Sequence, residues 1–421
     1  MRRFIHEVAL GGDMFERNIP EFVRHAPAPS VHGFATLTGV EAIARGSLVS
    51  VFPLEMYRSL KEAQVVSEIY FVIGLASLLI GLLVPMISRH LSRRWTYTLG
   101  AVTMICGCGL AAYGHPIGLI FGLMLTTFAT VTLFVCLNAY VLDYVKRHDF
   151  GKCETLRMLY SAAGWTLGPV VGVTLWEWWR PLPFFVSITA SFALIIIFWV
   201  MRLGNGKLIT KAKKPTINPF AYLSRFFKQK RLVAGWIFAV TRSCGWWVYV
   251  VYLPIYALEN GLGSSIGGIL LSVTNSALFI TPLMLFLLRR MGVKMAVRSG
   301  FLLAGSLFIL AGVLGDWPLI TIGLLFAGSF ALIFLDICAG LPFLMAVKPS
   351  DRDEMSAVYS SFRDVSAIIT PGASAVVLLM APLATVFTFG GSLLLLSWGI
   401  AGKLNRRLGD VRSKTQVMEI S

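Results

Sequence analysis

Charged residues are scarce in this sequence, and their scarcity excludes an ordinary soluble protein. They make up 14% of the 421 residues, whereas soluble domains carry about 25%. Hydrophobic residues make up 56%, and the mean hydropathy is +0.74. So little polar surface cannot cover a water-exposed protein of this length. The composition therefore predicts a polytopic membrane protein.

The motifs of ATP-driven and enzymatic chemistry are also missing. There is no Walker GxxxxGK[ST] sequence, no HExxH, no paired Cys/His spacing for a metal and no nucleophile elbow at a plausible depth. The six cysteines lie almost entirely within apolar stretches, where cysteine acts as a small hydrophobic residue. We therefore expect no enzymatic activity, no cofactor and no metal.

Acidic residues are few as well, with 21 Asp and Glu against 37 Lys and Arg and a net charge of +16. The basic residues lie between apolar runs, so their placement favours a membrane topology signal over a nucleic-acid partner. Residues 1–33 carry scattered charges and no continuous apolar core, which is unlike a secretory signal peptide.

Twelve apolar segments are long enough to cross a bilayer, whose core of about 30 Å needs about 20 residues of helix. They cover residues 35–57, 65–87, 95–114, 116–144, 156–178, 182–202, 232–257, 264–288, 295–314, 317–346, 355–379 and 382–402. The sequence thus predicts an all-α membrane protein with 12 transmembrane helices.

The connections between these segments alternate in charge. Lys and Arg concentrate in 88–94, 146–152, 203–231, 289–294, 348–354 and 403–414. The intervening connections are short and have only Arg58, Lys61 and Arg180 near them. Because basic loops stay on the cytoplasmic side, we expect both termini in the cytoplasm and the protein in the cytoplasmic (inner) membrane.

Landmarks in the first six segments recur in the last six at a nearly constant offset. The pairs, with their separations, are Pro53 and Pro254 (201), Ser88 and Leu288 (200), Val145 and Val347 (202), and Pro169 and Pro371 (202). Parallel six-helix halves related by an axis along the membrane normal are one way in which transporters are built. We therefore predict two pseudo-symmetric six-helix bundles.

The expected divisions follow from this repeat. They are a cytoplasmic N-terminal segment (1–33), an N-terminal half (34–202), a basic cytoplasmic linker (203–231), a C-terminal half (232–403) and a cytoplasmic tail (404–421).

With these features the chain resembles a major facilitator superfamily transporter. Ser92, Arg93 and Arg94 stand where the superfamily's signature loop has Gly-Arg-Arg, and Gly292 and Lys294 occupy the corresponding places in the second half. The signature's acidic residue is replaced, by Arg89 in one half and Arg289 in the other. The resemblance implies that these loops form a cytoplasmic gate, built differently from the family's charge relay.

A second motif resembles the fifth-helix pattern of exporters in this superfamily. Gly164, Gly168 and Gly172 recur every four residues and form one smooth helix stripe, with Pro169 as a kink. Pro371 repeats the kink in the eleventh segment. We expect this helix to pack closely against its symmetry mate while neighbouring helices satisfy the carbonyl that proline frees. The alternative is generic tight packing, which is common in membrane helices.

Ionisable residues inside apolar segments are costly and usually mark a pathway. Those at depth are Glu41, Arg45, Arg242, Asp336, Arg363 and Asp364, and Trp246 follows Arg242 as a candidate aromatic contact. We expect Asp336 or Glu41 to exchange protons, because low dielectric favours a protonated carboxyl unless a cation pairs with it. The arginines would hold an anionic group. Alternatively, the set neutralises itself without any coupling role. The fourth-helix Arg of proton-coupled family members has no match in 126–142.

Together these features predict a secondary active transporter that works by alternating access, an exporter driven by the proton gradient. Its partners would be a small organic molecule, amphipathic and with a negative group, together with protons and bilayer lipid, and we expect a monomer. An uptake symporter for a metabolite is one alternative. A non-transporting receptor or scaffold on a transporter fold is the other.

Overall fold

The computed structural model describes residues 30–145, 150–201, 219–347, 355 and 358–404. Nearly all of the predicted tail and of the predicted N-terminal segment, and most of the basic linker, lie outside these residues. Within the described residues, regular secondary structure is helical throughout and no strand occurs.

The first half contains the helices α2 (Val31–Gly46), α3 (Val51–Leu60), α4 (Ala63–Ala112), α5 (Pro116–Tyr144), α6 (Phe150–Trp178) and α7 (Leu182–Val200). A short helix, α8 (Pro219–Phe227), falls inside the segment predicted as a linker. The second half contains α9 (Lys230–Trp247), the π-helical turn η3 (Val248–Tyr252), α10 (Leu253–Glu259), α11 (Ser265–Ser276), the 3₁₀ turn η4 (Ala277–Ile280), α12 (Thr281–Met291), α13 (Val293–Val313), α14 (Pro318–Cys338), α15 (Leu341–Ala346), α17 (Phe362–Leu378) and α18 (Ala384–Ala401).

These helices are consistent with the twelve predicted segments. Among the described residues, nine helices are long and apolar enough to cross a membrane, with α4 contributing two of them on either side of a kink. The other three segments consist of shorter pieces. The seventh is α9–η3–α10, the eighth is α11–η4–α12, and the eleventh is α17 with 17 residues. The predicted all-helical membrane fold is therefore confirmed, and the described helices are consistent with two six-helix bundles.

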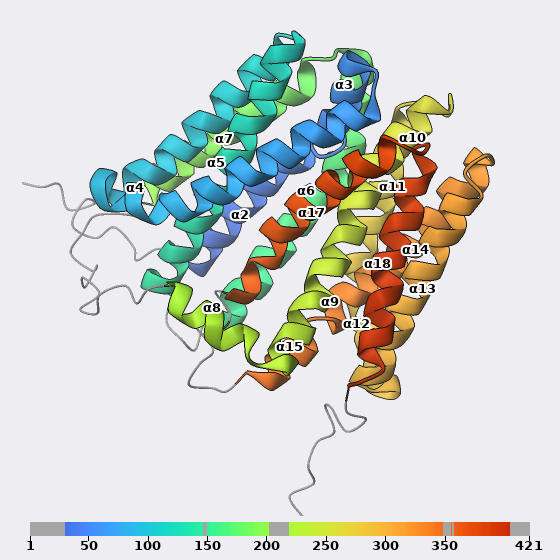
Figure 1. Ribbon diagram of the computed structural model, residues 1–421. Helices are drawn as coiled ribbons and strands as arrows, with labels where there is room; N and C mark the ends of the chain where they lie inside the picture. The colour runs from blue at the N-terminus through green and yellow to red at the C-terminus, as the bar shows by residue number, and fades with distance from the viewer. Residues whose placement is uncertain (1–29, 146–149, 202–218, 348–354, 356–357, 405–421) are drawn as a thin grey trace, which may run out of the picture.

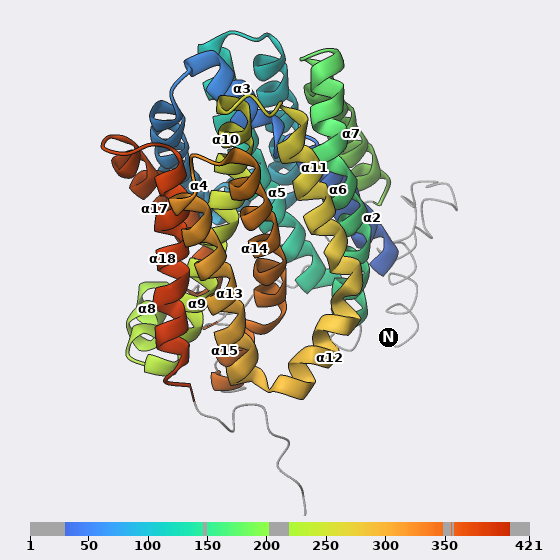
Figure 2. The same ribbon diagram turned by 90° about the vertical axis from the view of Figure 1, so that its right-hand side faces the viewer.

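The two halves lie side by side, with α2–α7 forming one bundle and α9–α18 the other (Figures 1 and 2). The connections 61–62, 113–115, 179–181, 260–264, 314–317 and 379–383 lie at one end, which we call the short-loop face. The opposite end, where α8, α12 and α15 lie, includes the described basic residues Lys228, Lys230, Arg231, Arg290 and Lys294, and is called the basic face.

Backbone conformation repeats between the halves, as the sequence offset predicts. Ser92 has φ 60° and ψ 148°, and Gly292, 200 residues later, has φ 75° and ψ 155°. Both residues turn the chain at the basic face, the first inside α4 and the second between α12 and α13. This region is essentially reserved for glycine, so the serine is strained.

Cation–π contacts repeat in the same way. The Arg94 guanidinium carbon lies 3.6 Å from the centre of the Trp199 ring, and that of Arg298 lies 4.9 Å from the Trp398 ring. In each half the contact joins the third helix segment to the sixth. The halves therefore share local contacts as well as their helix order.

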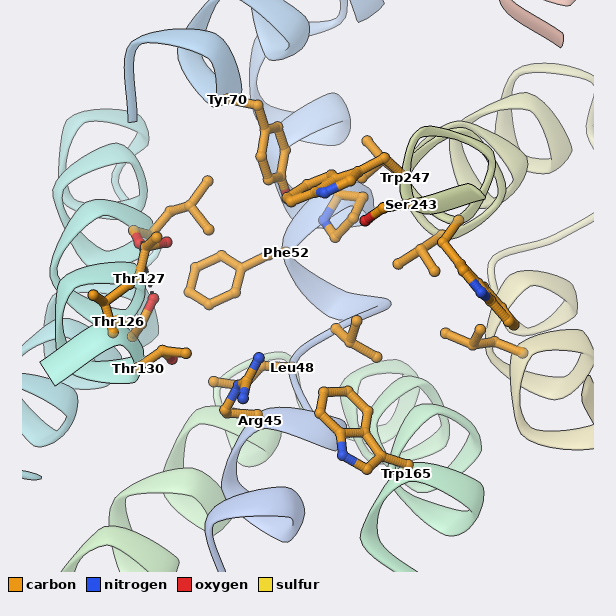
Figure 3. A pocket seen from close by; sticks show the side chains of 18 of the residues that line it. Arg45, Leu48, Phe52, Tyr70, Thr126, Thr127, Thr130, Trp165, Ser243 and Trp247 are labelled. Carbon is orange, nitrogen blue, oxygen red and sulfur yellow. Dashed lines mark hydrogen bonds between the residues drawn. The ribbon is translucent and has the colours of Figure 1, made fainter. Parts of the chain in front are cut away.

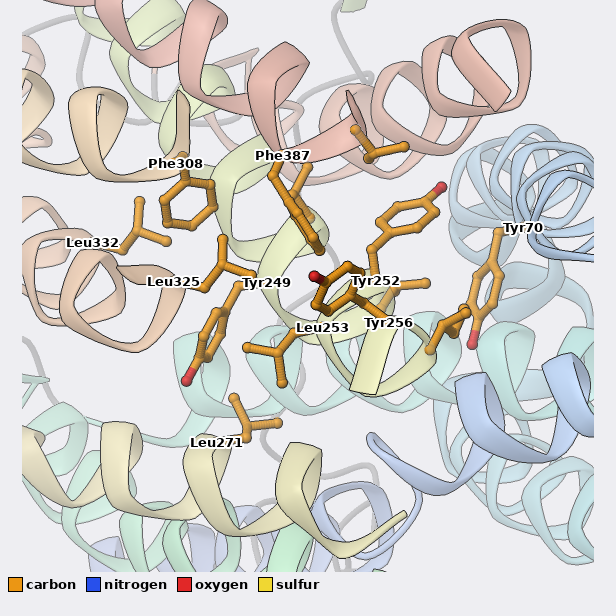
Figure 4. Close-up of a cluster of buried hydrophobic side chains, with 14 of the residues drawn as sticks. Tyr70, Tyr249, Tyr252, Leu253, Tyr256, Leu271, Phe308, Leu325, Leu332 and Phe387 are labelled. Atoms are coloured by element: carbon orange, nitrogen blue, oxygen red, sulfur yellow. The ribbon is translucent and has the colours of Figure 1, made fainter. Parts of the chain in front are cut away.

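The largest buried cluster continues from one half into the other. In the second half it is rich in aromatic residues, with Tyr249, Tyr252 and Tyr256 packed among leucines and phenylalanines (Figure 4). Tyr70 of α4 belongs to the same cluster. This continuity places apolar packing directly beside the space between the halves.

The glycine stripe of α6 packs differently from our expectation. A Cβ on Gly168 would lie 2.7 Å from Gly46 Cα, and one on Gly164 would lie 2.6 Å from the Ala42 carbonyl carbon. Gly172 similarly meets the Ser47 carbonyl. The stripe thus lies against α2 in its own half, so the predicted contact with the symmetry mate is wrong. Glycine spacing shows that a helix face is smooth, but not which neighbour meets it.

Candidate functional site

A cavity of about 530 Å³ lies between the two halves (Figure 3). Its polar lining comes from both halves and consists of Arg45, Thr126, Thr127, Thr130, Ser243, Asn275 and Asp336. Its aromatic lining consists of Phe52, Tyr70, Trp165, Trp246 and Trp247. The volume suits a drug-sized molecule.

Arg45 supplies the positive charge on the N-terminal wall. It lies in the last turn of α2, one turn after Glu41, and its Nη1 is 3.2 Å from Glu41 Oε1. The Arg45 side chain is 34% exposed, whereas that of Glu41 is 9% exposed. The guanidinium also stacks over Trp165, 5.2 Å from the ring centre. The buried Glu41 carboxylate therefore orients the Arg45 guanidinium, and the guanidinium remains accessible from the cavity.

Asp336 supplies the negative charge on the C-terminal wall. Arg242 Nε lies 2.9 Å from Asp336 Oδ1, and Trp246 Nε1 donates a 3.0 Å hydrogen bond to Oδ2. Arg242 and Trp246 are four residues apart on α9, which puts both on one helix face. The buried Arg242 Nε makes no aligned hydrogen bond among the described residues, so its contact with Asp336 is an ion pair.

The threonines of α5 present hydrogen-bond acceptors to the cavity. Thr126 and Thr127 both donate their hydroxyl protons to the Leu123 carbonyl, over 3.0 and 2.8 Å. Because a hydroxyl has a single proton, the lone pairs remain for a ligand. This wall therefore favours a ligand that brings N–H or O–H groups.

Contacts between the halves close the cavity toward the short-loop face. Helices α6 and α11 run antiparallel, and Asn275 Nδ2 donates to the Trp165 carbonyl over 2.8 Å. Nearer the short-loop face, the Val170 amide donates to Ser272 Oγ over 3.0 Å. Nearer still, Ser264 donates to Glu177.

Helix α4 of the first half also meets the second half. Ser67 and Tyr252 share a 2.8 Å hydrogen bond, and the Tyr70 and Trp247 rings lie edge to face, 6.0 Å apart. Both contacts lie on the same side of the cavity as the α6–α11 bonds. The short-loop side is therefore held shut in this conformation.

The predicted pathway residues separate into two groups. Arg45, Trp246 and Asp336 line the cavity, with Glu41 and Arg242 as their ion-pair partners. Arg363 and Asp364 do not belong to its lining and lie near the start of α17, at the basic face.

Arg363 lies between the halves on that side. Its guanidinium is 4.9 Å from the ring of Phe134 on α5 and 5.6 Å from that of Phe362. Among the described residues, no carboxylate lies within 4.0 Å of it. It therefore adds positive charge on the basic-face side of the cavity.

The predicted gate loops are described only in part. Arg93 lies over the Tyr140 ring at 5.5 Å, and Arg94 lies over Trp199, so both contact helices of their own half. Gly292 forms the turn described above. The side chains of Arg89 and Arg289 lie outside the described part of the structure.

Sequence reasoning missed several contributors. Trp165, Asn275 and the three threonines line the cavity although none is ionisable. Glu55 is buried and accepts a 2.7 Å hydrogen bond from Trp176, which joins α3 to α6. A polar amide in a membrane helix was the available signal for Asn275, because such a group needs a partner in lipid.

Comparison with known proteins gives the family. Residues 34–371 match the Major Facilitator Superfamily, while no curated protein matches the chain in sequence. The chain therefore belongs to the Major Facilitator Superfamily, and it is a membrane-embedded transporter.

Solved structures share the fold. The nucleoside transporter NupG is 15% identical, covers 89% of this chain and 100% of its own, and has a TM-score of 0.64. A POT family transporter in complex with 5-aminolevulinic acid is 13% identical, covers 92% and 99%, and has a TM-score of 0.67. The POT family transporter PepTSo is 12% identical, covers 88% and 96%, and also has a TM-score of 0.67.

Proposed function

We propose that this member of the Major Facilitator Superfamily exports an amphipathic organic anion from the cytoplasm in exchange for protons. The observation that carries the proposal is the cavity between the halves, with Arg45 on one wall and Asp336 on the other. Alternating access then opens this cavity first to one membrane face and then to the other.

The anionic group of the substrate would bind Arg45. Its guanidinium is the exposed member of the pair with Glu41, and charge-assisted hydrogen bonds to a carboxylate are stronger than neutral ones. Arg363 adds positive charge on the route from the basic face. Aromatic rings around the cavity favour an apolar or ring-bearing body.

The other end of the substrate would carry hydrogen-bond donors. Thr126 and Thr127 offer lone pairs, and Asp336 offers a carboxylate that is 32% exposed despite its pair with Arg242. A proton and a substrate donor group cannot occupy the same carboxylate oxygen at once. Mutual exclusion at Asp336 would give exchange of substrate against protons.

The same ion pair also supports a second candidate, an uptake symporter. A proton on Asp336 removes the charge that holds Arg242, and a freed Arg242 would attract a substrate anion. Proton and anion would then bind together and move in one direction. A receptor or scaffold without transport remains the third candidate.

The positive-inside rule supports the topology in the proposal. By this rule the basic face and both termini would lie on the cytoplasmic side of the cytoplasmic membrane. The short-loop side is closed by the α6–α11 contacts, so this conformation would receive substrate from the cytoplasm.

The pH dependence of binding separates the candidates. A thermal-shift screen of organic anions, cations and neutral compounds on purified protein first identifies a ligand, and its affinity is then measured between pH 5 and 8. Exchange predicts weaker binding as the pH falls, because protons compete for Asp336. Symport predicts tighter binding.

Proteoliposomes provide the transport test. An exporter in everted vesicles or inside-out liposomes accumulates the ligand when a proton gradient is imposed. A protein that binds the ligand but shows no counterflow is a receptor or scaffold, which would refute the transport proposal. Preference for cations over anions in the screen would refute the proposed substrate class.

A further inference from the structure

Pro169 leaves a carbonyl of α6 without its usual partner. Proline has no amide proton, so the carbonyl four residues earlier, that of Trp165, lacks an i+4 donor. Asn275 of the opposite half meets this carbonyl with its side-chain amide, over 2.8 Å. The hydrogen bond thus crosses between the halves at a place fixed by the proline.

The equivalent position in the α4–α17 interface is built differently. Pro371 in α17 frees the Ala367 carbonyl, and the residue facing it is Gly74, 201 positions before Asn275. A Cβ on Gly74 would lie 2.8 Å from the Ala367 oxygen. The α6–α11 interface therefore has a polar side chain at this point, whereas the symmetry-related α4–α17 interface has only backbone atoms there.

The Asn275–Trp165 bond also differs from its neighbours along α6 and α11. Asn275 and Trp165 both line the cavity, whereas Val170, Ser272 and Glu177 do not. Among the hydrogen bonds between α6 and α11, the Asn275–Trp165 bond is therefore the one in which a bound substrate would contact both residues.

We propose that Asn275 couples occupancy of the cavity to opening of the short-loop side. The inference rests on the proposed alternating access of an organic anion. An anion at Arg45 lies beside Trp165, because the guanidinium stacks over that ring. An anionic oxygen is a stronger acceptor than a backbone carbonyl, so it competes for the Asn275 amide protons.

Loss of the bond then weakens the contact between α6 and α11. An empty cavity keeps the bond and holds the short-loop side shut. An occupied cavity releases Asn275 from Trp165, and the interface opens with substrate inside. Asn275 is accordingly a positioning residue that acts through the Trp165 carbonyl.

The test measures the effect of Asn275→Ala in the parent protein and in the Pro169→Ala variant. Spin labels on Tyr113→Cys and Asp316→Cys, in a Cys106→Ser chain, report the distance between the halves at the short-loop face. Tyr113 and Asp316 are exposed and belong to different halves. The ratio of open to closed distances is measured without ligand by electron–electron double resonance.

We expect Asn275→Ala to raise the open-to-closed ratio about fivefold, the effect of losing one ordinary hydrogen bond. Pro169→Ala restores an amide that donates to Trp165 within the helix, so Asn275→Ala should then change the ratio less than twofold. Ser276→Ala is the matched control, because its hydroxyl bonds to Val273 of its own helix.

Benzoate, with neutral benzamide as control, tests the effect of an anion. Benzoate should raise the open population of the parent protein but not that of the Asn275→Ala variant. An equal shift by Asn275→Ala in both backgrounds, or no response to benzoate, overturns the inference. If every variant shows a single, unchanged distance between the two spin labels, alternating access is overturned as well. If open and closed populations both occur but their ratio does not change in Asn275→Ala, only this inference is overturned.

Discussion

Asp336 and Trp246 are joined by a 3.0 Å hydrogen bond from the indole nitrogen to one carboxylate oxygen, while Arg242 pairs with the other oxygen. The carboxylate is thus oriented by two groups of α9 and still faces the cavity. This arrangement gives Asp336 a fixed position from which to bind either a proton or a substrate donor.

Asp336→Asn should abolish proton-driven accumulation while leaving substrate exchange. The amide keeps the shape and the contact with Trp246 but cannot be protonated at working pH. Counterflow and gradient-driven uptake in proteoliposomes measure the two activities separately. Asp316→Asn, an exposed acid in a short loop, is the control and should retain both. Full gradient-driven uptake by Asp336→Asn would exclude Asp336 as the coupling residue.

Arg45→Lys should weaken binding of the anionic ligand about tenfold, even though the charge is kept. Lysine lacks the planar guanidinium that stacks on Trp165 and that can donate two parallel hydrogen bonds to a ligand carboxylate. Calorimetric titration of the ligand found in the screen measures the change. Arg58→Lys is a matched control, since Arg58 also lies over a tryptophan, Trp176, but outside the cavity. Equal affinity losses in both variants would contradict a direct role for Arg45.

Gly168→Ala should destabilise the protein by about 1–3 kcal/mol, because the new methyl group meets the rigid backbone of Gly46. Thermal unfolding in detergent measures the loss. Gly399→Ala is the control, since a Cβ there meets no atom within 4 Å and alanine is the better helix former. A Gly168→Ala protein that melts at the parent temperature would show that α2 and α6 separate easily.

Ser92→Gly should stabilise the protein by about 1 kcal/mol, because glycine adopts φ 60° and ψ 148° without steric cost. Ser92→Ala retains the strained backbone and serves as the comparison. Melting temperatures of the two variants give the difference. If Ser92→Gly is no more stable than Ser92→Ala, the positive φ at this turn does not strain the chain.

The sequence by itself determined the membrane class, the helical segments and the duplication. Hydrophobic length depends on bilayer thickness, and the offset between Pro169 and Pro371 is a property of the chain alone. The sequence also identified Arg45, Arg242 and Asp336, because ionisable residues inside apolar segments are costly in lipid and usually have a function.

Only the tertiary structure decided which side chains meet. Rotation of each helix about its axis determines that Arg45 and Asp336 share one cavity while Arg363 lies outside its lining. The same rotation places the glycine stripe of α6 against α2 and directs Asn275 to the carbonyl that Pro169 frees. Helix periodicity gives the faces of a helix, but the choice of neighbour for each face depends on packing of the whole bundle.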